Sequence, residues 1–191
     1  MYKSAAKFAA ASKNEPIVFG SAQPGYSNEQ VNEWLQFMQG QAIKRVCCLL
    51  SVSQLNQYSN LLGIYQQTFG IGQVCWAPVE DFSFADPEVL IHQILPFLAT
   101  ANQKNERVVV HCAGGIGRTG HVLAAWLIAA RGFSKKAAIK AVKATGRNPY
   151  EAVIAAPLKG RNPWKALTEL NLLLDECIRF RDTNRFFSTP P

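Results

Sequence analysis

RVVVHCAGGIGRTG, residues 107–120, decides the fold of this chain, because it joins a strand pattern to a helix pattern through a glycine-rich turn. The β-branched run Val108–Val110 is typical of a buried strand, and the small and apolar residues after Thr119 indicate a buried helix. Three glycines lie between the two patterns. Strand and helix patterns also alternate along the rest of the chain. The sequence therefore predicts an α/β protein with a mostly parallel central sheet and helices on both faces.

The same turn has the composition of an anion-binding site. Backbone N–H groups in a turn before a helix point into one concavity at the positive end of that helix. Cys112 lies at the start of the turn and Arg118 at its end. A thiol in such a position is expected to have a pKa of roughly 3.5–7.5 in place of about 8.5, and a guanidinium can bind two phosphate oxygens. These residues predict a covalent phosphoryl-cysteine intermediate.

The segment His111–Gly120 resembles the signature H-C-x-x-G-x-x-R-[ST] of the cysteine-dependent protein tyrosine phosphatases. The similarity to their small dual-specificity branch extends from about residue 17 to residue 181. The chain has no glutamine after Gln103, so the water-positioning glutamine of the larger tyrosine-specific members is missing. The loop holds no lysine, which favours singly phosphorylated substrates, and Ile116 makes its rim apolar.

The resemblance implies a role for each residue of this phosphatase-type loop. Cys112 would be the nucleophile, and Arg118 would hold the equatorial phosphate oxygens. His111 would orient the loop and tune the thiol, and the Thr119 hydroxyl would stabilise the departing thiolate. The backbone amides that would bind phosphate are those of Ala113, Gly114, Gly115, Ile116, Gly117 and Arg118.

A general acid is expected within residues 76–90, WAPVEDFSFADPEVL, because the leaving alcohol or phenol needs a proton. Asp81 ends a stretch that resembles the family's P-[IV]-x-D loop, which implies that Asp81 is this acid. Asp86 is the alternative, although Asp-Pro-Glu is also the pattern of an N-cap and a first helical turn. Glu80 is expected to be a solvated neighbour.

Length and composition indicate one folded domain. A chain of 191 residues, 48% of them hydrophobic, is not intrinsically disordered. We expect a flexible leader over residues 1–16, a catalytic domain over 17–181 and a flexible tail over 182–191. The basic N-terminus lacks the apolar region of a secretory signal, although a transit peptide stays open. No apolar stretch has the ~20 residues of a membrane span, and five cysteines in no paired pattern predict a reduced, cytoplasmic protein.

The expected elements follow from periodicity and from cap residues. Pro96 is expected to kink the helix that contains it. Ser27-x-x-Gln30 resembles a capping box, Ser134 a helix cap, and both Asn148-Pro149 and Asn162-Pro163 a cap with a first-turn proline. The predicted helices cover residues 27–40, 55–70, 87–101 and 118–131, and the predicted strands cover 43–50, 74–79 and 107–111.

Positive charge is concentrated in one part of the chain. Residues 118–165 contain ten Lys and Arg residues and one acid, Glu151, whereas the whole chain carries +7. Lys136, Lys140 and Lys143 share one helical face, which is either merely solvated or the source of a field that speeds the capture of anionic substrates. Aromatic residues do not alternate with the basic ones, so no nucleic-acid partner is expected.

The function predicted from these observations is a phosphatase that uses no metal and no cofactor. Its expected substrates are phosphotyrosine, with phosphoserine and phosphothreonine as further candidates, in phosphoproteins. Two alternatives stay open: a phosphatase of a lipid, a nucleotide or an RNA 5′ end, and a pseudophosphatase that only binds phosphoproteins. The sequence does not determine an oligomeric state.

A redox hypothesis concerns two neighbouring cysteines. Cys47 and Cys48 lie on a predicted strand, where alternation points them to opposite faces of the sheet. At most one of them can therefore approach Cys112 and form a protective disulfide with it.

Overall fold

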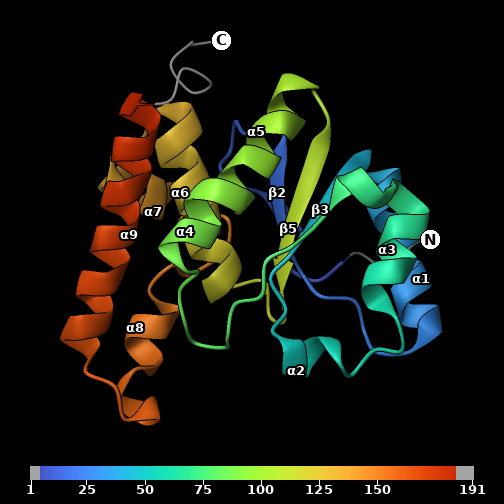
Figure 1. Cartoon of the computed structure of the whole chain (residues 1–191), viewed down its shortest axis with the longest axis horizontal. Coiled ribbons are helices and arrows are strands. Elements are labelled where there is room, and N and C mark those ends of the chain that lie inside the picture. Colours follow the sequence, from blue (N-terminus) through green and yellow to red (C-terminus); the bar gives the residue numbers. More distant parts are fainter. Residues whose placement is uncertain (1–4, 184–191) are drawn as a thin grey trace.

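The computed structural model describes residues 5–183 of the chain (Figure 1). Its centre is a sheet with the strand order β1-β2-β5-β3-β4. β1 is antiparallel to β2, and the other neighbouring strands are parallel. The strands are β1 (Ala9–Ala10), β2 (Val18–Ala22), β3 (Ile43–Cys48), β4 (Val74–Trp76) and β5 (Arg107–Cys112).

Helices cover both faces of this sheet, which confirms the predicted architecture (Figure 1). One face packs against α1 (Asn28–Gly40) and α3 (Leu61–Phe69), and the other against α5 (Leu95–Gln103) and α6 (Gly117–Arg131). Almost the whole of α6 is buried, because α7 (Lys135–Ala144), α8 (Glu151–Ala155) and α9 (Pro163–Thr183) pack on its other sides. The helix that carries the glycine-rich turn at its N-terminus is thus held on every side.

Local cap chemistry starts several helices where the sequence predicts them. Ser27 and Gln30 form the expected capping box of α1, and the Ser134 hydroxyl accepts a hydrogen bond from the Ala137 amide in the first turn of α7. The Asn162 side chain caps α9 by accepting from two amides of its first turn. The Asn148 side chain also accepts from an amide, that of Tyr150, but the residues after it form a turn and α8 begins only at Glu151. The helix therefore starts later than the Asn148-Pro149 pattern predicts.

The helix predicted over residues 55–70 begins later than expected: α3 covers only Leu61–Phe69, and a separate short helix, α2, ends at Leu55. α2 (Val52–Leu55) begins with a capping box between Ser51 and Gln54, and α3 begins after Asn60, whose side chain accepts from the amide of Gly63. Each cap side chain accepts from an amide that, inside a continuous helix, would donate to a carbonyl of the preceding turn. β4 ends at Trp76, before the predicted end at residue 79, although the amides of Ala77 and Val79 still donate to the carbonyls of Cys48 and Leu49.

The expected disturbance at Pro96 takes the form of a π-helical turn rather than a sharp kink. α4 (Pro87–Val89) continues into the π turn η2 (Leu90–Ile94) and then into α5. Proline has no N–H to donate and its ring crowds the carbonyl four residues earlier. A wider turn immediately before Pro96 removes both conflicts.

The leader predicted as flexible over residues 1–16 is instead folded over residues 9–15. β1 pairs with β2, and the Glu15 carboxylate is buried, where it accepts from the amides of Ile17 and Val18 and binds Arg131. Residues 1–4 and 184–191 lie outside the described residues, and Asp182 and Thr183 of the predicted tail belong to α9. No helix within residues 5–183 is long and apolar enough to cross a membrane.

Candidate active site

The glycine-rich turn connects the carboxyl end of β5 to the N-terminus of α6. Cys112 is the last residue of β5, a strand that lies between β2 and β3. Gly115 has a φ of +67°, and a Cβ at this position would lie 2.6 Å from the backbone of Ser21 and Ala22. Only glycine meets both conditions. The turn is therefore held tightly against the end of β2.

The Cys112 thiol lies at the base of this turn and is almost fully buried. The Thr119 hydroxyl donates a hydrogen bond to its Sγ over 3.2 Å. The first backbone hydrogen bond of α6 runs from the Gly120 amide to the Ile116 carbonyl. The amides before Gly120 therefore have no acceptor within the helix. The sulfur thus lies where the helix dipole and a hydroxyl donor both favour negative charge.

Arg118 and Asp81, which the sequence places 37 residues apart, meet at this pocket. An Nη2–Oδ1 ion pair of 3.0 Å joins them. The other terminal nitrogen of the guanidinium, Nη1, donates to the Val79 carbonyl over 2.9 Å and to the Gln54 side chain over 2.7 Å. Arg118 is buried, whereas the Asp81 side chain is about half exposed. The Arg118 guanidinium, which would hold phosphate, is therefore bound to the loop that carries the candidate acid Asp81.

The two acid candidates of this loop have different surroundings. The Asp86 carboxylate accepts from the amides of Glu88 and Val89 and so caps α4. Asp81 instead faces Arg118, and Glu80 is exposed to solvent as expected. The geometry places Asp81 and not Asp86 beside the arginine of the turn.

His111 lies beneath the turn and is fully buried. Its Nε2 is 3.2 Å from the Tyr65 hydroxyl, and its ring meets the rings of Trp34 and Tyr65 edge to face. Burial lowers the pKa of His111 to about 3, and the charge of Arg118 acts in the same direction, whereas the Cys112 backbone opposes it. The imidazole is neutral at physiological pH. It can orient the turn but adds no positive charge beside the thiol.

His121 is a second buried histidine, and the sequence analysis missed it. Its Nε2 accepts from the Ala85 amide over 3.0 Å, and Phe84 packs against its ring. Burial lowers its pKa to about 4, so the ring stays neutral and keeps its acceptor. This contact fastens the loop after Asp81 to α6. The one clue in the sequence is a histidine inside an otherwise apolar helix.

Glu151 is a second carboxyl group at the pocket, and it was also missed. A Cβ on Gly117 would collide with its carboxylate, and that carboxylate accepts from the Gly117 amide. Burial raises the pKa of Glu151, and the charge of Asp81 raises it further, against the lowering effects of the Gly117 amide and Arg118. A carboxylate at this amide competes for a donor that would otherwise face phosphate.

Arg147 supports the turn from below. It is buried, and its guanidinium donates to the carbonyls of Lys7 and Ala9 and to Thr145. A side chain on Gly20 would collide with this guanidinium. Burial lowers the pKa of Arg147 to about 10, a value at which the group is still charged at physiological pH. A buried cation therefore joins β1 to the elements under the turn.

The cysteines of β3 point to opposite faces, as expected. Cys47 belongs to the same apolar cluster as Cys112, and Cys48 to the cluster on the other face. Cys47 is paired in register with Cys75 of β4. Hydrogen bonds from Cys47 and Gln93 lower the pKa of Cys75. A disulfide between Cys112 and Cys47 or Cys48 stays a prediction.

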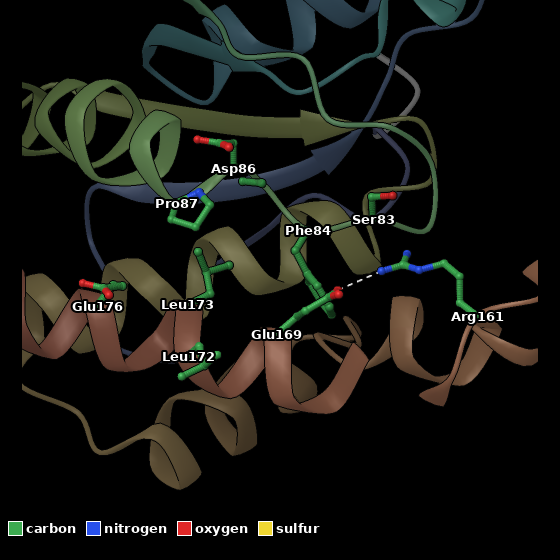
Figure 2. A pocket seen from close by; sticks show the side chains of 10 residues that line it. Ser83, Phe84, Asp86, Pro87, Arg161, Glu169, Leu172, Leu173 and Glu176 are labelled. Atoms are coloured by element: carbon green, nitrogen blue, oxygen red, sulfur yellow. Dashed lines mark hydrogen bonds and ion pairs between the residues drawn. The ribbon is translucent and has the colours of Figure 1, made fainter. Parts of the chain in front are cut away.

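A groove of about 500 Å³ lies behind the loop that follows Asp81. Figure 2 shows its walls, formed by Phe84 and Pro87 on one side and by Leu172 and Leu173 of α9 on the other. The ion pair between Arg161 and Glu169 lies across one end. Of the residues named for catalysis, only the alternative acid Asp86 lines this groove. Among residues 5–183, no group of three or more His, Cys, Asp or Glu side chains is placed to hold a metal ion.

The fold and this turn define a domain of the cysteine-dependent protein tyrosine phosphatase superfamily, in its small dual-specificity branch. Residues 27–152 match the family model "Dual specificity phosphatase, catalytic domain", and the chain belongs to that family.

Among curated proteins, human dual specificity protein phosphatase 5 is 27% identical over 137 residues, which cover 68% of this chain and 34% of that protein. The chain thus spans about a third of the length of this relative. Among solved structures, Tk-PTP in its active form aligns with a TM-score of 0.63 and 24% identity over 90% of this chain and 99% of that one. PTPMT1 in complex with PI(5)P aligns with a TM-score of 0.61 and 15% identity over 92% and 94%. At these identities the two structures show the shared fold.

Proposed function

We propose that the chain hydrolyses phosphate monoesters, with Cys112 as the nucleophile. One observation carries the proposal: a buried thiol with a hydroxyl donor lies at the base of a turn whose arginine is paired with an acidic loop residue. A purely structural cysteine needs neither partner. The combination of nucleophile, phosphate fork and acid is what a covalent phosphoryl transfer requires.

In the first step, the Cys112 thiolate attacks phosphorus, so that an S–P bond forms and the P–O bond to the leaving group breaks. The leaving oxygen takes a proton from the Asp81 carboxyl group. Because Arg118 is bound to Asp81 in the structure, the entering phosphate must replace this carboxyl group at Nη2. Substrate binding therefore frees Asp81 to act as the acid.

In the second step, water attacks phosphorus and gives a proton to the Asp81 carboxylate. The S–P bond breaks, inorganic phosphate leaves, and the sulfur departs as a thiolate. The Thr119 hydroxyl, 3.2 Å from Sγ, donates to the charge that develops on the sulfur. Asp81 thus gives a proton in the first step and takes one up in the second. Neither step requires a metal or a cofactor.

The proposed substrates are proteins that carry phosphotyrosine and, beyond it, phosphoserine or phosphothreonine. We place the proposed reaction in the cytoplasm. The absence of lysine in the turn supports a singly phosphorylated group, and the apolar Ile116 supports an aromatic ring at the rim. A panel of phosphopeptides, phosphoinositides and nucleotides, assayed by released phosphate, separates these substrates from the non-protein ones. Faster turnover of a lipid or a nucleotide than of every phosphopeptide would contradict this assignment.

The covalent step is tested by Cys112→Ser in a buffer that contains EDTA. We expect turnover of p-nitrophenyl phosphate to fall by several orders of magnitude, while the affinity for inorganic phosphate is retained because the amides and Arg118 remain. The wild-type chain should keep its activity in EDTA. Residual activity of the variant within tenfold of the wild type would refute the mechanism. Phosphopeptide binding by a wild-type chain without turnover would indicate a pseudophosphatase.

A further inference from the structure

The segment between α8 and α9 exposes large apolar side chains. We call residues 154–165 the tip segment; it includes the end of α8, the 3₁₀ turn η3 (Pro157–Lys159) and the start of α9. Leu158 is 89% exposed, Trp164 76% and Ile154 66%. Among the described residues, seven large apolar side chains are exposed, and three of them lie within these twelve positions. Isolated exposed apolar residues are ordinary, but a cluster indicates a surface that meets another apolar phase.

The charge of the tip segment has one sign. It contains Lys159, Arg161 and Lys165 and no acidic residue. Arg161 is paired with Glu169 of α9, whereas Lys159 and Lys165 are exposed. Apolar side chains flanked by exposed ammonium groups are complementary to a surface that is apolar inside and anionic outside.

The tip segment also borders the active site. The Lys159 ammonium lies 5.2 Å from the centre of the Phe82 ring, and Arg161 donates to the Phe82 carbonyl over 3.2 Å. Phe82 follows the candidate acid Asp81 directly. At the other end of α8, Glu151 contacts Gly117 of the catalytic turn. In Figure 1, α8 and the turn after it lie at a lower corner of the molecule, on the side where the parallel strands end.

We propose that the tip segment docks the protein on an anionic lipid bilayer. Trp164 and Leu158 enter the interface between headgroups and acyl chains, where tryptophan is favoured, and Lys159 and Lys165 meet anionic headgroups. A narrow turn that projects its apolar side chains suits a deformable lipid surface. Docking brings the mouth of the active site to phosphorylated groups at that surface. The binding goes beyond the proposed hydrolysis and does not depend on it.

The test uses the full chain and vesicles of phosphatidylcholine with or without phosphatidylserine. Sedimentation measures binding, and tryptophan emission reports insertion, since Trp34 and Trp126 are buried and Trp164 is the most exposed of the four tryptophans. We expect binding and a blue shift with phosphatidylserine, both weakened by added salt. The Cys112→Ser variant should bind equally well, so a failure of catalysis and a failure of docking are distinguishable.

Variants locate the contact. Leu158→Asp and Trp164→Asp should each weaken vesicle binding roughly tenfold or more, because each removes a large apolar side chain from the interface. The matched control is Ile71→Asp, which changes a 79% exposed apolar residue near the amino end of β4 and should leave binding unchanged. All three variants should keep the wild-type turnover of soluble p-nitrophenyl phosphate.

Three results would overturn the docking proposal. The first is the absence of sedimentation and of a blue shift with anionic vesicles. The second is vesicle binding that Ile71→Asp weakens as much as Leu158→Asp does. The third is concentration-dependent self-association that Leu158→Asp abolishes without any vesicle binding by the wild type, which would make the tip segment a protein interface.

Discussion

Replacing Thr119 with valine should make breakdown of the phosphocysteine rate-limiting. Valine has the shape of threonine but no hydroxyl, so the change removes the 3.2 Å hydrogen bond to the Cys112 sulfur. Both residues are buried, which leaves no solvent to replace the donor. A hydrogen bond to a charged group contributes about 1.5–3 kcal/mol. If the departing thiolate loses this contribution, the second step should slow about 10- to 150-fold.

Rapid mixing with p-nitrophenyl phosphate measures this effect directly. The first step releases nitrophenolate before the S–P bond breaks, so the variant should show a burst of one nitrophenolate per active site and then a slow steady rate. The rate of the burst should not fall. In the first step the Thr119 hydroxyl stabilises the thiolate before it attacks phosphorus, and not the transition state of the attack. Thr119→Ser is the matched control, since it keeps the donor, and should show a steady rate close to that of the wild type.

The result that would refute this reasoning is a Thr119→Val chain without a burst and with a steady rate within threefold of the wild type. Failure of folding is a separate matter and is visible by circular dichroism. We expect the fold to survive, because the Thr119 methyl group that faces Gly20 has its counterpart in valine.

Four further substitutions test the rest of the site. Arg118→Lys should lower turnover by several orders of magnitude, because lysine lacks the planar two-donor fork; retention of most of the activity would show that only its charge matters. Asp81→Asn should slow phosphotyrosine peptides much more than activated aryl phosphates, which need little protonation. Asp86→Asn should change neither this ratio nor the melting temperature much, because asparagine caps a helix about as well as aspartate; the reverse pattern of turnover would assign the acid to Asp86. Glu151→Gln should tighten competitive inhibition by phosphate, and most at high pH. The pKa of the wild-type carboxyl group is raised, so this group gains its repelling charge as the pH rises through that value. If the difference in phosphate affinity between variant and wild type does not change with pH, the charge does not lie at the pocket.

The catalytic turn was predictable because its requirements are local. The residues from His111 to Thr119 are consecutive, and Gly115 meets both a positive φ and a close approach to the backbone of β2. The N-terminus of a helix creates the anion site whatever the rest of the fold does. Asp86 was recognisable as a cap alternative for the same reason, since a cap acts within one helical turn.

Other parts of the site depend on contacts between distant residues. Gln54 binds Arg118 across 64 positions, and His121 holds Ala85 across 36. Gln54 belongs to a capping box and His121 to an apolar helix, but neither local pattern indicates the distant partner. Gln54 lies in α2 (Val52–Leu55), a short helix that precedes the one predicted over 55–70. Apolar spacing alone did not reveal this short helix.

The sequence by itself determined the α/β class, the strand–turn–helix with Cys112 and Arg118, and Asp81 as the preferred acid in its loop. The first two conclusions rest on periodicity, on glycine and on cap chemistry, which act over a few residues, and the preference for Asp81 rests on the resemblance of its loop to P-[IV]-x-D. Only the tertiary structure decided that residues 9–15 are folded, that the buried histidines His111 and His121 are neutral, and that Glu151 lies at the turn. The physical reason is that burial and pairing depend on which distant segments meet, and free energy from such contacts outweighs local preference.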